Sequence, residues 1–140
     1  MESLILFLMV TICFIKADDN LAWKVVKKAL QFGDDLHLFC QVKNCCQKSA
    51  GWGKWTSDDH LITIFIDVKN LHNDGSLKYS GGTNKTGFFL RIRNITQGDL
   101  NISYSCTYGF QVSRKKNLLM EDALFSPPKT IETINRFKGL

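Results

Sequence analysis

The most reactive side chains in this sequence are those of its cysteines. Cys13 lies in an apolar stretch near the N-terminus, and the other four are Cys40, Cys45, Cys46 and Cys106. Cys13 would leave with the predicted signal peptide at residues 1–17, which is described below, so the exported chain would hold four cysteines. An even number of cysteines in an exported chain suggests disulfide bonds, and four cysteines allow three complete pairings. The number of cysteines does not by itself choose among these pairings.

The adjacent residues Cys45 and Cys46 have three interpretations: a vicinal disulfide, bonds to other chains, or free thiols. Neighbouring cysteines normally point apart, so a ring between them needs an unusual backbone geometry. Bonds to other chains would give a disulfide-linked homodimer. We do not expect a metal site here, because zinc requires more ligands and His60 is the nearest following histidine.

The sequence offers little support for catalysis or for a cofactor. His37, His60 and His72 have no Ser or Cys and Asp arranged around them by a known motif, and neither a Gly-rich phosphate loop nor an HExxH motif is present. The adjacent acidic pairs at 58–59 and 121–122 are typical of solvated surface. We therefore predict that the protein is not an enzyme and binds neither a cofactor nor a metal.

Three asparagines meet the Asn-x-Ser/Thr rule for N-linked glycosylation. They are Asn84, Asn94 and Asn101. A single match arises easily by chance, but three matches at expected strand ends of an exported chain predict a glycoprotein.

The chain divides into three predicted parts. Residues 1–17 resemble a secretory signal peptide, with an apolar run from Leu4 to Ile15 that is too short to span a bilayer. Residues 18–125 form one expected domain, and residues 126–140 form a C-terminal tail that follows Pro127-Pro128. We predict a secreted, extracellular protein with no membrane span.

The net charge of +5 is spread over the sequence. The basic residues occur in ones and twos, apart from the run Arg114-Lys115-Lys116. Charge alone therefore gives little reason to expect a nucleic-acid partner, and none is predicted.

The hydrophobic pattern mostly has a period of two, which is typical of strands with one buried face. Such alternation occurs at 36–40, 62–68, 88–92 and 104–108, between turns rich in Gly, Asn and Asp. We interpret residues 23–32 as an opening edge strand and 117–125 as a closing strand. Short strands without a long helical stripe indicate an all-β sandwich or barrel.

The spacing of several residues resembles that of variable-like immunoglobulin domains. Cys40 ends an alternating strand, Trp52 and Trp55 follow it by 12 and 15 residues, and Tyr104 precedes Cys106 by two. The stretch LKYSGGTNKTGFFLRIRNITQGDLNISYSC also resembles the D, E and F strands of antibody variable domains. The resemblance covers about residues 23–125 and implies an immunoglobulin-like, two-sheet antiparallel Greek-key sandwich.

The resemblance implies roles for residues in the core. Cys40 would pair with Cys106 between the sheets, and Tyr104 would be the tyrosine corner, with its hydroxyl bonded back to the chain. Between the two tryptophans we favour Trp55 as the core residue. If Trp52 pointed inward, Lys54 would accompany it toward the core, which requires the ammonium to escape to solvent.

The family layout also implies where the remaining features lie. Cys45 and Cys46 fall in the B to C loop at the recognition end, Asn84 lies at that same end, and Asn94 and Asn101 lie at the opposite corner. Glycans there leave the sheet of strands G, F, C and C′ as the candidate binding face. Its predicted outward residues are Trp52, Lys54, Phe65, Arg114, Lys115 and Lys116.

We therefore predict a secreted, glycosylated immunoglobulin-like binding module that recognises an extracellular protein or glycan in adhesion or immune recognition. The alternative is a soluble or truncated receptor or adhesion ectodomain that acts through disulfide-linked oligomers. A secreted inhibitor or effector is a third alternative, without a motif of its own. The fold alone does not decide among these functions, because the same sandwich serves many unrelated partners.

Overall fold

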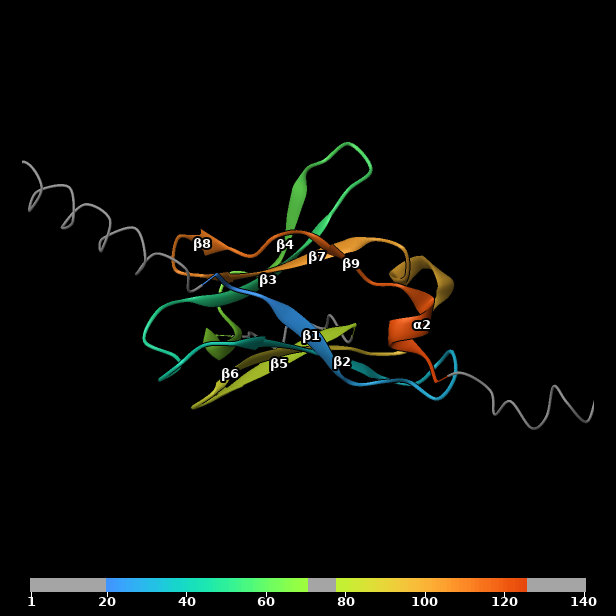
Figure 1. Ribbon diagram of the computed structural model, residues 1–140, viewed down its shortest axis with the longest axis horizontal. Helices are drawn as coiled ribbons and strands as arrows, with labels where there is room; N and C mark the ends of the chain where they lie inside the picture. Colours follow the sequence, from blue (N-terminus) through green and yellow to red (C-terminus); the bar gives the residue numbers. More distant parts are fainter. Residues whose placement is uncertain (1–19, 71–77, 126–140) are drawn as a thin grey trace, which may run out of the picture.

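The protein is a sandwich of two antiparallel β-sheets (Figure 1). The structure is a computed structural model that describes residues 20–70 and 78–125. The predicted signal peptide at 1–17 and the predicted tail at 126–140 lie outside the described residues. The predicted fold class, an all-β two-sheet antiparallel sandwich, is confirmed, and the arrangement is compatible with an immunoglobulin-like fold.

One sheet has four strands in the spatial order β1-β2-β6-β5. The second sheet has the order β4-β3-β7-β8, with β9 paired to β7. The strand bounds are Trp23–Lys27 (β1), Leu36–Gln41 (β2), Ala50–Trp55 (β3), Leu61–Phe65 (β4), Tyr79–Asn84 (β5), Gly87–Ile92 (β6), Ser103–Tyr108 (β7), Gln111–Val112 (β8) and Lys116–Asn117 (β9). The short helical segments are η1 (Val68–Asn70), η2 (Gln97–Asp99) and α2 (Met120–Ala123). Within this order β1 lies at an edge, as predicted, but the strand covers only Trp23–Lys27 of the predicted 23–32.

The alternation of apolar residues explains how the two central strands of the first sheet face the core. In β2, Leu38 is fully buried while its neighbour His37 is partly exposed. In β6, Leu90 is also fully buried and pairs directly with Leu38. Each such cross-strand pair removes apolar area from water on the inner face of the sheet. The period-two pattern in the sequence therefore identifies these strands correctly.

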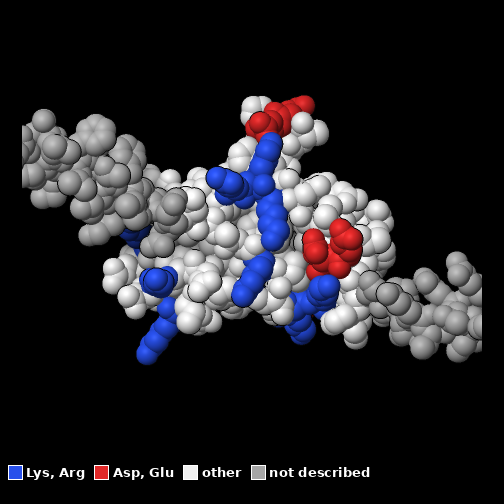
Figure 2. Space-filling model, in the orientation of Figure 1, with Lys and Arg blue, Asp and Glu red and all other residues white. Residues whose placement is uncertain are grey.

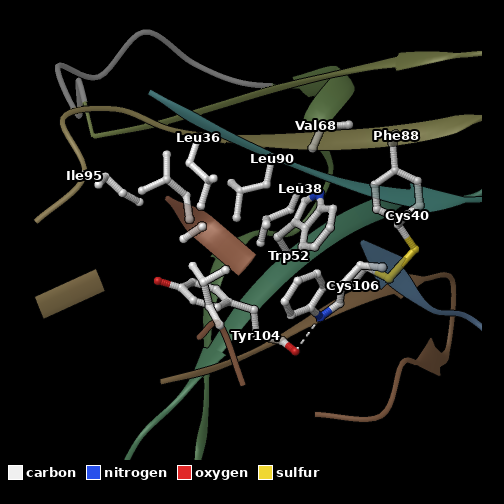
Figure 3. Packing of buried hydrophobic residues seen from close by; sticks show 14 of the residues in the cluster. Leu36, Leu38, Cys40, Trp52, Val68, Phe88, Leu90, Ile95, Tyr104 and Cys106 are labelled. Carbon is white, nitrogen blue, oxygen red and sulfur yellow. Dashed lines mark hydrogen bonds between the residues drawn. A yellow bond between two sulfur atoms is a disulfide. The ribbon is translucent and has the colours of Figure 1, made fainter. Parts of the chain in front are cut away.

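A disulfide joins the two sheets through the centre of the core (Figure 3). Cys40 on β2 bonds to Cys106 on β7, and their Cα atoms lie 6.3 Å apart. Trp52 and Phe88 pack beside this bond with their ring centroids 5.7 Å apart. Closing a loop of 66 residues stabilises a domain by about 4 kcal/mol through loop entropy.

The segment predicted as the closing strand, 117–125, is mostly not a strand. Only Lys116–Asn117 pairs with β7, and the chain then turns into α2. The backbone of Ala29 bonds on both sides of this turn, donating to Ala123 O at 2.8 Å and accepting from Phe125 N at 3.1 Å. These bonds satisfy part of the backbone of the segment without a long ladder, so a turn and a short helix replace most of the predicted strand.

Candidate functional site

The outer face of the five-stranded sheet is built from small side chains. In the β3–β7 register, Gly51 faces Thr107 and Gly53 faces Ser105. A Cβ atom on Gly53 would lie only 2.7 Å from Leu61 Cδ1. Glycine at this position therefore leaves room for the Leu61 side chain of β4 to lie over β3.

A groove of about 450 Å³ lies on this face. Its lining contains no charged side chain and consists of Ser49, Trp52, Gly53, Leu61, Thr63, Phe65, Ile66, Thr107, Gly109, Phe110 and Val112. We call it the apolar groove. A lining that is mostly apolar with a few polar atoms is typical of sites that accept a side chain or a small ligand.

Exposed apolar side chains lie on this groove and beside it. Phe110, at the turn between β7 and β8, is fully exposed, and Ile66 after β4 is 78% exposed. Val112 on β8 is 53% exposed, and Ile62 on β4, at the other edge of the sheet, is 46% exposed. The sequence pattern predicts that the isoleucines of 62–68 share a buried face, and this is wrong for Ile62 and Ile66. β4 is an edge strand of its sheet and has no fully buried residue, so alternation in its sequence does not require one buried face.

The assignment of the two tryptophans is the reverse of the prediction. Trp52 is 1% exposed and pairs with Cys106, whose side chain points into the core. Trp55 points to the outer face, where its Nε1 donates to Ser105 Oγ at 2.8 Å and the Lys115 ammonium lies 5.2 Å from its ring centroid. Trp52 is therefore not an outward residue, and Trp55 is not the core tryptophan.

Lys54 explains why the inward position of Trp52 is tolerated. Its side chain follows Trp52 to the inner side, but the ammonium reaches the ring of Tyr79 on β5, 5.8 Å from the centroid. Lys54 is partly exposed, so its apolar stem is buried while its ammonium remains in contact with water beside the Tyr79 ring. Lys54 is therefore not an outward residue of the predicted binding face.

The remaining predicted binding residues divide between two places. Phe65 is partly buried and packs against the core, although it also contributes to the groove lining. Arg114, Lys115 and Lys116 are exposed as predicted, on the segment that leads into β9. Of the predicted binding residues, Phe65 and the inward-pointing Trp52 contribute to the groove lining, and the three basic residues do not.

Tyr104 has the geometry of the predicted tyrosine corner. Its ring is fully buried, and its hydroxyl donates to the backbone oxygen of Asp99 at 2.9 Å. Burial raises the pKa of the Tyr104 phenol, and the nearby Tyr79 and Asp99 add to this effect. The Asp99 carboxylate in turn accepts from Thr96 N at 2.8 Å and forms an ion pair with Lys78 at 2.7 Å. This corner fixes the connection between the two sheets.

Two other titratable groups have shifted pKa values on the four-stranded sheet. The hydrogen bond from Arg91 lowers the pKa of the Asp35 carboxyl, and the backbone N–H of Asn94 lowers it further. Partial burial lowers the pKa of His37, as do the charges of Lys27 and Arg91. The ring of His37 stacks on Phe89, with centroids 5.8 Å apart. These groups lie on the opposite sheet from the apolar groove and carry no candidate site.

The loop between β2 and β3 holds Cys45 and Cys46, which are bonded to each other. This is the vicinal alternative among those that the sequence leaves open, and neither sulfur is left for a bond to a second chain. Cys45 N donates to Lys85 O at 3.2 Å, and Lys69 Nζ donates to Cys46 O at 2.8 Å. The first bond ties the loop to the turn after Asn84, and the second ties it to η1. Asn84 therefore lies at the same end of the sandwich, as the family layout implies.

The three glycosylation motifs lie on the surface. Asn84, Asn94 and Asn101 are all exposed. The Asn84 Oδ1 atom accepts from Thr86 N at 2.8 Å and from Thr86 Oγ1 at 2.7 Å. Each position therefore has room for a glycan.

Comparisons with known proteins provide no family for this chain. No protein-family model matches the sequence, and a search of the curated proteins found no match. Among the described residues, no three His, Cys, Asp or Glu side chains gather into a group that could hold a metal ion. No helix in that part of the chain is both long and apolar enough to cross a bilayer. The site must therefore be interpreted from its own geometry.

Proposed function

We propose that this chain is a secreted, glycosylated binding module of the variable-like immunoglobulin kind, and that it recognises an extracellular or cell-surface protein. The support from the fold is the strand order, the disulfide between the sheets and the tyrosine corner. The fold does not supply a function by itself, so the proposal depends on the surface.

The apolar groove is the observation that carries the proposal. Exposed apolar residues are common one at a time, but here Ile66, Phe110 and Val112 are exposed around one uncharged depression. A partner that inserted an aliphatic or aromatic side chain into the groove would cover these residues and remove them from water. Protein interfaces are commonly organised around such anchors, with small and polar residues as complementary surface.

The positions of the glycosylation motifs are compatible with a binding role for the apolar groove. Asn84 lies on the four-stranded sheet, at the end that holds the Cys45–Cys46 loop. Asn94 and Asn101 flank η2, at the connection between β6 and β7. Glycans at these positions would cover the two ends of the sandwich and leave the apolar groove open.

A binding screen with matched variants tests the proposal. The secreted chain, displayed as an oligomer to increase avidity, would be screened against an array of extracellular protein domains. For each hit, we expect the Ile66→Ser, Phe110→Ser double variant to bind at least about tenfold more weakly, because the anchor loses its apolar contacts.

A Leu30→Ser, Phe32→Ser double variant is the control, since these two exposed apolar residues lie outside the groove lining. Equal binding by the groove variant and the unmodified chain would refute the role of the groove. Equal losses in the two variants would mean that binding follows general surface hydrophobicity. An array without any hit would count against a protein-binding module.

A further inference from the structure

A row of basic side chains crosses the edge of the sandwich where β1 and β9 approach each other. Figure 2 shows Lys and Arg side chains in a line down the middle of this view, from the region of β9 to that of β1. We define the basic stripe as Lys24, Arg114, Lys115 and Lys116, all of which are exposed. None of these four residues lines the apolar groove, although Lys115 reaches the Trp55 ring on the same outer face of the five-stranded sheet.

The fold assembles this stripe from the two ends of the described chain. Lys116 Nζ donates to Trp23 O at 3.2 Å, and the same ammonium lies 4.8 Å from the centroid of the Trp23 ring. These contacts join β9 to β1 across a separation of 93 residues. Lys24 follows Trp23 directly in β1 and is exposed. The stripe therefore runs from one sheet to the other.

Of the four cations in the stripe, only Lys115 has a carboxylate within ion-pair distance among the described residues, although Figure 2 also shows acidic side chains beside the line. Lys115 forms an ion pair with Asp59. The other two ion pairs within residues 20–70 and 78–125 are Lys78–Asp99 and Arg91–Asp35, so Lys24, Arg114 and Lys116 have no carboxylate partner there. The electrostatic potentials of exposed cations add, and salt screens them beyond the Debye length of about 8 Å at physiological salt. A row of cations of this kind attracts a ligand that carries repeated negative charges.

The surroundings of the stripe distinguish among polyanions. Proteins that hold single-stranded nucleic acid stack its bases on open aromatic rings. Here Trp23 is 4% exposed beneath Lys116, and the Trp55 ring has the Lys115 ammonium 5.2 Å from its centroid. A lysine ammonium therefore already lies over each of the two tryptophan rings beside the stripe, which leaves neither ring open for a base to stack on. The cations themselves provide no apolar anchor of the kind that a protein partner uses.

The two disulfides favour an oxidising environment outside the cell. Sulfated polysaccharides are linear, carry a negative charge on most sugar units and need no stacking surface. We propose that the basic stripe binds a linear sulfated polysaccharide. This inference rests on the extracellular location in the proposed function, but it does not depend on the apolar groove.

The test compares two double variants with the same change of net charge. Lys24→Glu with Arg114→Glu reverses two cations of the stripe. Lys43→Glu with Lys48→Glu reverses two exposed cations in the loop after β2. The probe is a fluorescent heparin octasaccharide, titrated at about 0.15 M NaCl, and near-ultraviolet circular dichroism checks the fold of each variant.

We expect the stripe variant to bind at least about tenfold more weakly and with a shallower salt dependence, because it neutralises fewer anionic groups. The control variant should lose less than about threefold. Equal losses would overturn the proposal, since net charge alone would then explain binding. The absence of octasaccharide binding by the unmodified chain would also overturn it, as would equal binding of oligo-dT of matched charge.

Two further measurements keep the result interpretable. If the stripe variant does not fold, Lys24→Gln with Arg114→Gln removes the same cations without adding acidic charge. The Ile66→Ser, Phe110→Ser variant should bind the octasaccharide like the unmodified chain. The stripe variant should in turn keep the binding of any protein found in the array screen, so failure of one site leaves the other testable.

Discussion

The tyrosine corner provides the sharpest test of how the fold is held together. Tyr104 is fully buried, and its hydroxyl donates to Asp99 O at 2.9 Å. In Tyr104→Phe the ring still fills its place, but the buried carbonyl loses its donor. Leaving such a group unpaired costs about 1–3 kcal/mol. We expect a loss of about 2 kcal/mol, which lowers Tm by on the order of 10 °C in a domain of this size.

Urea unfolding followed by tryptophan fluorescence measures this loss, because Trp52 moves from the core to water on unfolding. Tyr108→Phe is the control. The Tyr108 hydroxyl accepts from the backbone N atoms of Gln47 and Lys48 at 2.9 and 3.2 Å, in an exposed loop where water can replace it. We expect this control to lose less than about 1 kcal/mol. Equal losses in the two variants would refute the reasoning.

The same hydroxyl predicts a pH dependence. Burial raises the pKa of Tyr104 in the folded protein, so folding disfavours the phenolate. The unfolded phenol titrates near a pKa of about 10. This stabilisation is therefore fully present below about pH 10 and is lost as the pH rises above that value. Tyr104→Phe should lose less stability than the unmodified protein between neutral pH and about pH 11.

Two further predictions, each with a matched control variant, test other parts of the fold. Trp52→Ala should destabilise the protein by about 3–5 kcal/mol in urea unfolding, because Trp52 is 1% exposed. Trp55→Ala should lower the free energy of unfolding clearly less. The reverse order would contradict the inward position of Trp52. The hydrogen bond from Arg91 lowers the pKa of Asp35, so its contribution is present above the unfolded pKa of about 3.9 and is lost as the pH falls below it. Asp35→Asn should flatten the acid side of the stability profile, whereas Asp122→Asn on the exposed surface of α2 should leave it unchanged.

The sequence predicts the parts of the fold that depend on local pattern. Alternation identifies β2 and β6 because each of these central strands is paired on both sides and buries one face in the core. The pairing of Cys40 with Cys106 and the bond from Tyr104 follow from the family resemblance and are present in the structure. The pattern is misleading at β4, an edge strand, where burial on one face is not required.

The core tryptophan shows a different limit of sequence reasoning. Two side chains two positions apart share a face of a strand, so Trp52 and Lys54 must be considered together. The prediction places Lys54 in solvent because a buried ammonium is costly. The structure avoids this cost by extending the Lys54 stem to the ring of Tyr79 on the other sheet. That contact joins residues 25 positions apart in sequence, and no local pattern indicates it.

The basic stripe also depends on residues that are far apart in the sequence, so the charge pattern of the sequence does not predict it. Lys24 and Arg114 are 90 positions apart, so the composition shows only a modest net charge with no cluster besides 114–116. Because β9 pairs with β7 in one sheet and β1 lies at the edge of the other, closing the sandwich brings the two basic segments together. The apolar groove spans the outer face of the five-stranded sheet from β4 to β8, and none of its lining residues belongs to the stripe. A polysaccharide on the stripe and a side chain inserted in the groove would therefore contact different residues, so we expect the two ligands to bind at the same time.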